Sequence, residues 1–136
     1  MRRILGLDFG EKRIGLSISN QTGKLALPYG VITNSTERQS IREIKKICQK
    51  EKIKELVIGL PITLKGKEGR EVEKVRQFAQ KLKEATQLSI IFEDERFSSK
   101  QAEKVLKERG AKGRKGKIDT LSAVLILNQY LEKEDV

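Results

Sequence analysis

The hydrophobic pattern of this chain changes period once, near Thr36, and that change limits the folds open to it. Before Thr36, apolar residues alternate with small or polar ones, as in half-buried strands. The runs are separated only by the short polar stretches GEKR and NQTGK, which predict turns. Strands joined by such short turns pair in an antiparallel fashion. The predicted strands cover residues 3–8, 14–19 and about 25–32.

After Thr36 the pattern alternates between helical spacing and short apolar runs. Helices are expected at 36–50, from about 69, at 99–109 and at 119–132, and strands at 55–61 and 88–96. Helical crossovers between strands imply parallel neighbours and right-handed connections. The predicted fold is therefore α/β: a mixed five-stranded sheet, with strands one to three antiparallel and strands four and five added in parallel, flanked by helices. We expect one domain over residues 1–136, since a length of 136 residues is typical of a single domain.

The charge balance favours a polyanionic partner. Lys and Arg total 29 against 19 acidic residues, a formal net charge of +10. Such an excess suits nucleic acid, although a lysine-rich surface without a partner is the simpler interpretation. The chain has no histidine, which excludes catalytic schemes built on a Ser–His or Cys–His pair. Its one cysteine, Cys48, falls on the apolar face of a predicted helix, so we expect it to be buried and inert.

The N-terminal sequence MRRILGLDFG does not resemble a signal peptide, because Gly6 and Asp8 interrupt its short apolar stretch. No apolar run approaches the roughly 20 residues that a membrane-spanning helix needs. These features predict a cytoplasmic protein without a membrane partner.

Acidic residues stand where the predicted strands end. Asp8 ends the first strand, and Asp94 and Glu95 end the fifth. If strands one, four and five are parallel, their carboxyl ends share one edge of the sheet, which is where open α/β sheets bind ligands. Asp119 begins the apolar last helix, and the small residues Ser122 and Ala123 on its face would let that helix approach the sheet closely.

Converging carboxylates repel one another unless cations join them. Oxygen ligands suit Mg²⁺ or Mn²⁺, and two such ions about 4 Å apart are a common arrangement for phosphodiester hydrolysis. A basic chain with this acidic cluster is therefore a nuclease hypothesis. Each acid also has a plain structural explanation: Asp8 as a turn residue, Asp119 as a helix N-cap, and Asp94 and Glu95 as surface partners of Arg96.

Four stretches of the chain resemble the signatures of one family. GLDFGEKRIGLSIS, VIGLPITLKGKEGR, FEDERFSS and DTLSAVLILNQYL are similar to motifs of the YqgF (RuvX) family, in the same order, between residues 3 and 131. These are RNase H-like proteins related to Holliday-junction resolvases. The resemblance implies an RNase H-like fold and a nuclease that processes the 5′ end of the small-subunit (16S) ribosomal RNA precursor, in ribosome biogenesis. Some members resemble resolvases of branched DNA.

The resemblance also implies which acids bind metal and carry catalysis: Asp8, Glu95 and Asp119, around Mg²⁺ or Mn²⁺. Asp94 ranks below Glu95, since it points to the opposite side if the strand continues. Which of these two is the ligand stays open, and so does the source of a fourth ligand, which could be a water, a substrate phosphate or Asp94.

Two further groups of residues have supporting roles in the predicted site. The residues expected to contact nucleic acid are Lys12, Arg13, Arg70, Arg96, Lys112, Arg114 and Lys115. The last three lie in the run RGAKGRKGK, for which an uninvolved surface segment is the alternative explanation. The residues expected to shape the backbone are Gly10, Gly15, Gly59 and Pro61.

Two other function classes fit parts of the sequence. A non-catalytic RNA-binding factor of ribosomal particles would need only the basic charge. An ATPase of the actin-like kind also uses Asp-x-Gly hairpins around phosphates, but this chain is far too short for two such domains. The substrate, whether a ribosomal RNA precursor or branched DNA, and the oligomeric state cannot be read from the sequence.

Overall fold

The structure is a computed structural model that describes residues 3–61, 70–94 and 115–134. Five strands and three helices lie within these residues. In chain order they are β1 (Ile4–Phe9), β2 (Arg13–Ser19), β3 (Ala26–Thr33), α1 (Glu37–Lys50), β4 (Glu55–Leu60), α2 (Arg70–Thr86), β5 (Ser89–Asp94) and α4 (Lys115–Glu134). The helix predicted at 99–109 lies outside the described residues.

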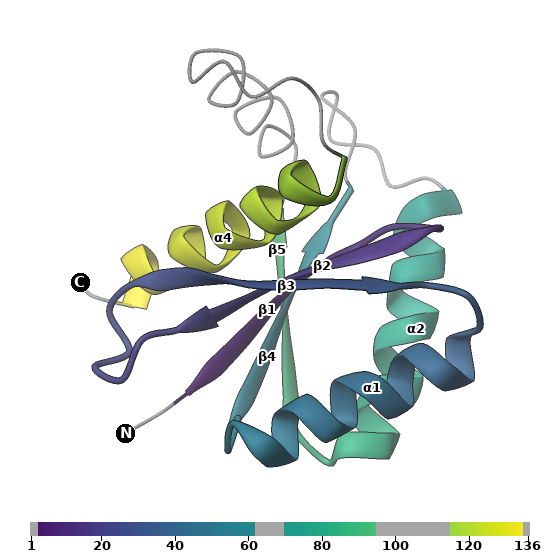
Figure 1. Cartoon of the computed structure of the whole chain (residues 1–136), viewed down its shortest axis with the longest axis horizontal. Coiled ribbons are helices and arrows are strands. Elements are labelled where there is room, and N and C mark those ends of the chain that lie inside the picture. Colours follow the sequence, from purple (N-terminus) through teal and green to yellow (C-terminus); the bar gives the residue numbers. More distant parts are fainter. Residues whose placement is uncertain (1–2, 62–69, 95–114, 135–136) are drawn as a thin grey trace.

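The five strands form one mixed sheet in the order β3-β2-β1-β4-β5 (Figure 1). Strand β2 pairs antiparallel with both β1 and β3, whereas β4 is parallel to β1 and to β5. The predicted sheet is therefore confirmed. Its central strand β1 and the two crossover strands end at the same edge, as the prediction for the acidic residues requires.

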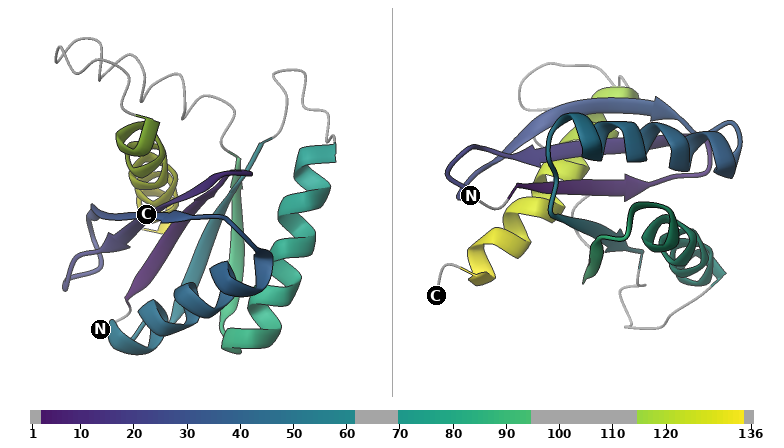
Figure 2. Two further views of the ribbon diagram at one scale, coloured as in Figure 1. Left: turned by 45° about the vertical axis from the view of Figure 1, so that its right-hand side comes forward. Right: turned by 90° about the horizontal axis from the view of Figure 1, so that it is seen from below.

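Helices cover both faces of the sheet (Figures 1 and 2). Helices α1 and α2 lie side by side on one face, and α4 crosses the other. Two apolar clusters match these layers. Leu5, Leu7 and Phe78 belong to the cluster on the α1/α2 face, and Ile4 and Leu127 to the cluster on the α4 face. Successive residues of β1 thus alternate between the two cores, as period-two side chains must.

Helix α1 shows how local signals define an element here. The hydroxyl of Thr36 accepts a hydrogen bond from the backbone N–H of Gln39 at 3.2 Å, which caps the helix N-terminus. Ile44 and Cys48 are buried on the inner face one turn apart. The predicted burial of Cys48 is confirmed, and burial raises the pKa of its thiol to about 11.

The prediction for the start of the last helix was wrong. Helix α4 begins at Lys115, not at Asp119, so Asp119 lies inside the helix and is not its N-cap. Glycine costs about 1 kcal/mol in a helix relative to alanine, but lysine is a good helix former. The two lysines at 115 and 117 favour a helix enough to offset the glycine between them, so the helix extends N-terminal to its apolar part. No helix within the described ranges is both long and apolar enough to cross a membrane.

Candidate functional site

The carboxylate of Asp8 belongs to the α4 face of the sheet. In β1, Ile4 packs in the cluster formed with α4, and a Cβ at Gly6 would stand 3.0 Å from Leu127 Cβ. Side chains alternate along a strand, so Asp8 shares this face. It is half-buried, at the end of β1 where the parallel strands also end. The predicted position at the sheet edge is confirmed.

Glycines flank Asp8 on both neighbouring strands. Gly15 of β2 is its antiparallel partner. On the other side, Leu7 pairs with Ile58 of β4, so the next residue in register is Gly59. Neither neighbour carries a side chain to cover the Asp8 carboxylate on this face. The predicted shaping roles of Gly15 and Gly59 thus gain a concrete form, since the two glycines leave space beside an acid.

Helix α4 approaches the sheet closely next to this acid. The hydroxyl of Ser17 donates a hydrogen bond to the carbonyl oxygen of Ala123 at 2.7 Å, and both residues are fully buried. A Cβ added at Gly6 would meet Ser17 Oγ at 2.3 Å and the Ala123 carbonyl oxygen at 3.2 Å. The close approach predicted from the small residues of α4 is confirmed. Asp119 stands one helical turn before Ala123 on the backbone of α4.

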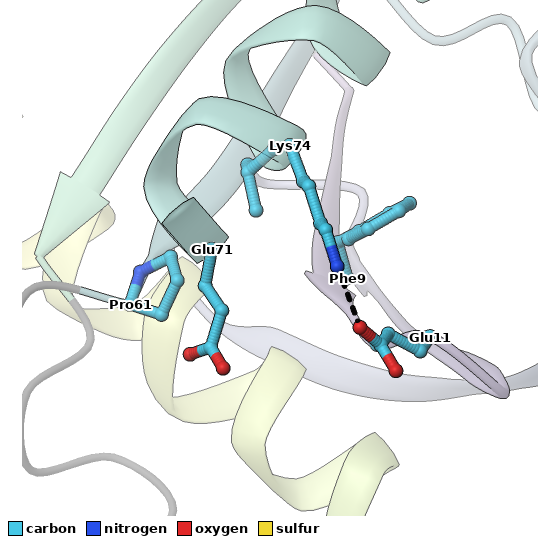
Figure 3. Close-up of a pocket in the computed structure, with 7 residues that line it drawn as sticks. Phe9, Glu11, Pro61, Glu71 and Lys74 are labelled. Carbon is cyan, nitrogen blue, oxygen red and sulfur yellow. Dashed lines mark hydrogen bonds and ion pairs between the residues drawn. The ribbon is translucent and has the colours of Figure 1, made fainter. Parts of the chain in front are cut away.

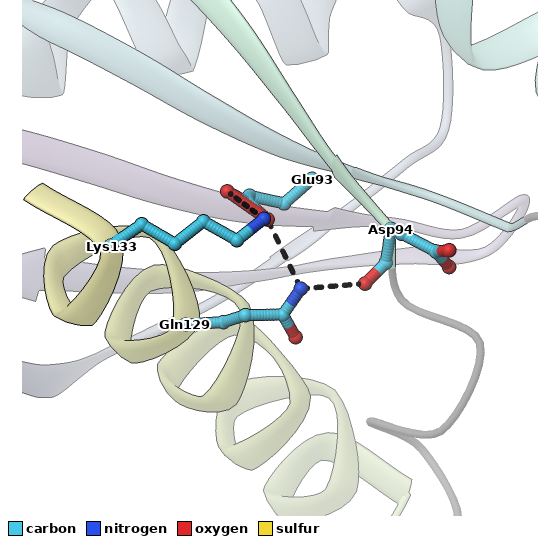
Figure 4. A network of polar contacts seen from close by, with 4 residues as sticks. All are labelled: Glu93, Asp94, Gln129 and Lys133. Atoms are coloured by element: carbon cyan, nitrogen blue, oxygen red, sulfur yellow. Dashed lines mark hydrogen bonds and ion pairs between the residues drawn. The ribbon is translucent and has the colours of Figure 1, made fainter.

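A second carboxylate on the α4 face was not predicted. Glu93 in β5 is 4% exposed and pairs in register with Gly59, so it lies in the same row across the sheet as Asp8. It accepts hydrogen bonds from Gln129 and Lys133 of α4 (Figure 4). Strand alternation could have predicted this burial. Glu93 is two residues after Ile91 and so shares its face, and Ile91 packs against the α4 cluster. A charge at such a position needs partners.

Asp94 projects from the opposite face. It follows Ile90 and Phe92 in the alternation of β5, and both of these pack against the α1/α2 cluster. Figure 4 shows its carboxylate directed away from Gln129. The structure therefore does not bring the carboxylates of Asp8 and Asp94 to one face.

The remaining predicted site residues fall wholly or partly outside the described residues. Glu95, Arg96, Lys112 and Arg114 lie outside the described residues, and Arg70, Lys115 and Asp119 are described only as parts of helices. Among the described residues, no group of three or more acids, histidines or cysteines could hold a metal ion. Within the described residues, the donor that Asp8 offers at this edge is a carboxylate oxygen, the type that Mg²⁺ and Mn²⁺ prefer.

The turn after Asp8 is tightly constrained. A Cβ at Gly10 would lie 2.6 Å from the carbonyl oxygen of Arg13, so the turn requires glycine. Asn34 fixes the same turn: its side chain donates to the Gly10 carbonyl at 2.7 Å, and its backbone N–H donates to the Lys12 carbonyl at 2.8 Å. Lys12 is exposed and Arg13 is half-buried at the start of β2. Their phosphate contacts stay a prediction.

A surface pocket of about 230 Å³ lies at the same edge but on the α2 side (Figure 3). Phe9, Pro61, Glu71 and the ion pair between Glu11 and Lys74 line it. The hydrogen bond from Lys74, 2.8 Å long, lowers the pKa of the Glu11 carboxyl. Acidic residues in the first turn of α2 suit the helix dipole but oppose a bound phosphate. The pocket is lined by residues of α2, whereas Asp8 lies on the α4 face of the sheet, so the two are separate.

Comparison with known proteins places the chain in a family. The family profile described as "RuvX: Holliday junction resolvase" matches residues 2–133. A protein of Sulfurihydrogenibium sp. (strain YO3AOP1), named "Putative pre-16S rRNA nuclease", is 44% identical over 98% of this chain and 92% of its own length. A protein of the same name from Anaplasma marginale (strain St. Maries) is 40% identical over 96% of this chain and 85% of its own length.

Solved structures agree on the fold. The chain superposes on Thermus thermophilus RuvC, solved in complex with a Holliday junction substrate, with a TM-score of 0.63 at 13% identity. The match covers 99% of this chain and 96% of that one. At this identity the likeness concerns the fold alone. It confirms the predicted RNase H-like architecture of a mixed five-stranded sheet with helices.

Proposed function

We propose, from the premise that this chain belongs to the RuvX family of Holliday junction resolvases, that it is a metal-dependent endonuclease. The enzyme class follows from the family, whose members are named as nucleases. The observation that carries the metal dependence is the position of Asp8. Its carboxylate stands on the α4 face between two glycines, at the edge where the parallel strands end. Such a position leaves room for a ligand that needs oxygen donors.

Asp8, Glu95 and Asp119 would hold the metal in this proposal. Glu95 and Asp119 enter from the sequence motifs, and Asp8 from both the motifs and the structure. Bound Mg²⁺ or Mn²⁺ would supply activation of a water and stabilisation of the leaving oxygen in phosphodiester hydrolysis. The protein contributes fixed carboxylates and a cationic surface that attracts the phosphate backbone.

The proposed substrate is the precursor of 16S ribosomal RNA, cut in the processing of its 5′ end. Relatives that are 40% and 44% identical over nearly the whole chain carry the name of pre-16S rRNA nuclease. The net charge of +10 supports a nucleic-acid substrate but does not distinguish RNA from DNA. Such an enzyme would act in the cytoplasm, where it would meet ribosomal particles. Branched DNA is the second candidate substrate, because the family description names Holliday junctions.

Cleavage assays on two substrates test the proposal. Wild-type protein should cut a structured RNA that spans the 5′ end of 16S rRNA only with Mg²⁺ or Mn²⁺ present. Replacing a group that merely supports a metal ligand typically costs about 10–100-fold in metal affinity or activity. Asp8→Asn should therefore lower the cleavage rate by at least about 100-fold. A four-way DNA junction, assayed in parallel, determines which substrate is preferred.

Asp94→Asn is the matched control, since Asp94 is an acid at the same edge whose side chain leaves from the other face. It should retain most of the activity. Cleavage that persists in chelator, or that survives in Asp8→Asn, contradicts the proposal. Salt-sensitive RNA binding without any cleavage would favour the non-catalytic factor instead.

A further inference from the structure

A polar network joins helix α4 to the end of β5, beside the proposed metal centre (Figure 4). The side-chain amide of Gln129 donates to Glu93 Oε2 at 3.0 Å and to the main-chain carbonyl of Asp94 at 3.1 Å. Lys133 Nζ lies 2.9 Å from the same Oε2 and 3.3 Å from Oε1. One helix therefore holds both the side chain and the backbone of the last residues of β5.

This arrangement is costly for a purely structural link. Glu93 is 4% exposed, and a buried carboxylate must lose its hydration before any partner compensates for it. An apolar residue of similar volume would commonly be as stable or more so. The neighbouring position Ile91 shows that α4 packs well against apolar side chains on β5. The network therefore requires an explanation beyond the attachment of α4 to the sheet.

The location of the network supplies that explanation. Gln129 bonds the carbonyl of Asp94, the residue directly before Glu95 in the sequence. Glu93 also stands in the same row as Asp8, with only Gly59 between them. Asp8 and Glu93 come from β1 and β5, at the two ends of this row. Helix α4 carries Asp119 one turn before Ala123, which accepts the hydrogen bond from Ser17. Contacts from α4 to β5 thus fix the helix that carries Asp119 relative to the sheet that carries Asp8.

We propose that Gln129 and Lys133, acting through buried Glu93, are positioning residues for the metal centre. They hold the end of β5, in the row that Glu93 shares with Asp8, against the helix that carries Asp119. Neither residue contacts the metal in this account. The inference rests on the proposed function, because it assigns a role in a metal site that the function requires.

The chain offers a control for the structural part of this effect. Tyr130 Oη donates to Glu55 Oε1 at 2.7 Å, which ties the same helix to the opposite end of β4. Gln129→Met removes two hydrogen bonds between α4 and the sheet, and Tyr130→Phe removes one. Only the bonds of Gln129 lie at the edge that carries Asp8.

Mn²⁺ binding, measured by isothermal titration calorimetry without substrate, separates the two roles. Gln129→Met should weaken Mn²⁺ affinity about 10-fold, the lower end of the loss that follows when a group supporting a metal site is replaced. Tyr130→Phe should bind Mn²⁺ like the wild type, even if both variants melt at a similarly lowered temperature. Equal Mn²⁺ affinity in the two variants overturns the inference.

A second variant keeps the test decisive if Gln129→Met does not fold. The Lys133 side chain is 64% exposed, and Lys133→Met leaves the Gln129 bonds to Glu93 and to the Asp94 carbonyl in place, so the contact between α4 and β5 is kept. It should also weaken Mn²⁺ binding, and unchanged binding would overturn the inference. A wild-type protein that binds no Mn²⁺ would contradict the proposed function itself. Wild-type binding that both variants retain would overturn the inference alone.

Discussion

The space beside the Asp8 carboxylate is set by the residues that flank it on the neighbouring strands. Gly15 and Gly59 lack side chains on the face where Asp8 projects, and the turn that follows requires glycine at position 10. The sequence indicates Asp8 readily, since an acid at the end of an apolar run is unusual. It does not reveal that glycines flank the acid on both sides, because that depends on the register between strands.

Glu93 illustrates what single-residue reasoning overlooked. The run FEDER draws attention to its last acids, whereas the buried one comes first. Glu93 is buried because it lies on the face of β5 that α4 covers. Its partner in α4, Gln129, lies 36 residues further along the chain. A contact at that separation cannot be read from local pattern.

Cys48 gives a prediction at the scale of one side chain. Its thiol is buried against the core, and its pKa is raised to about 11 because burial disfavours the thiolate. The thiolate is the reactive form, so at neutral pH the native protein should react with a thiol reagent far more slowly than the unfolded chain. Absorbance assays with and without denaturant measure this difference. Equal rates would mean that α1 is not packed as described.

Among the elements, α4 was predicted correctly as a helix packed on the sheet, but its first residue was not. Its apolar residues predicted a helix against the sheet, and Ala123 indeed packs on β1 and β2. The glycines and lysines before Asp119 predicted a loop, yet the helix begins at Lys115. Propensity is a weak signal there because packing of the later turns stabilises the whole helix.

Gly6→Ala tests the docking of α4 on the sheet. The added methyl would collide with Ser17 Oγ, so Ser17 would have to release the Ala123 carbonyl or α4 would have to shift. Overpacking of this kind costs about 1–3 kcal/mol, which urea denaturation can measure as a loss in the free energy of unfolding. Gly30→Ala is the control, since a Cβ there meets nothing within 4 Å. Equal stability of the two variants would contradict the described contact.

At the scale of the whole molecule, strand order was the most predictable property. Short turns require β1, β2 and β3 to be neighbours, and helical crossovers require β4 and β5 to run parallel to β1. This order alone brings the ends of β1 and β5 to one edge. The angle at which α4 crosses that edge was not predictable, because it arises from contacts such as those of Ser17 and Gln129.

Anomalous diffraction from crystals soaked in Mn²⁺ tests the central claim most directly. The account predicts an anomalous peak at ligand distance from the Asp8 carboxylate, about 2.0–2.2 Å for ions of this kind with oxygen ligands, on the α4 face of the sheet. The peak should vanish in Asp8→Asn. A peak only in the pocket of Glu11 and Glu71 on the α2 side, or none at Mn²⁺ concentrations that support cleavage, would contradict the account.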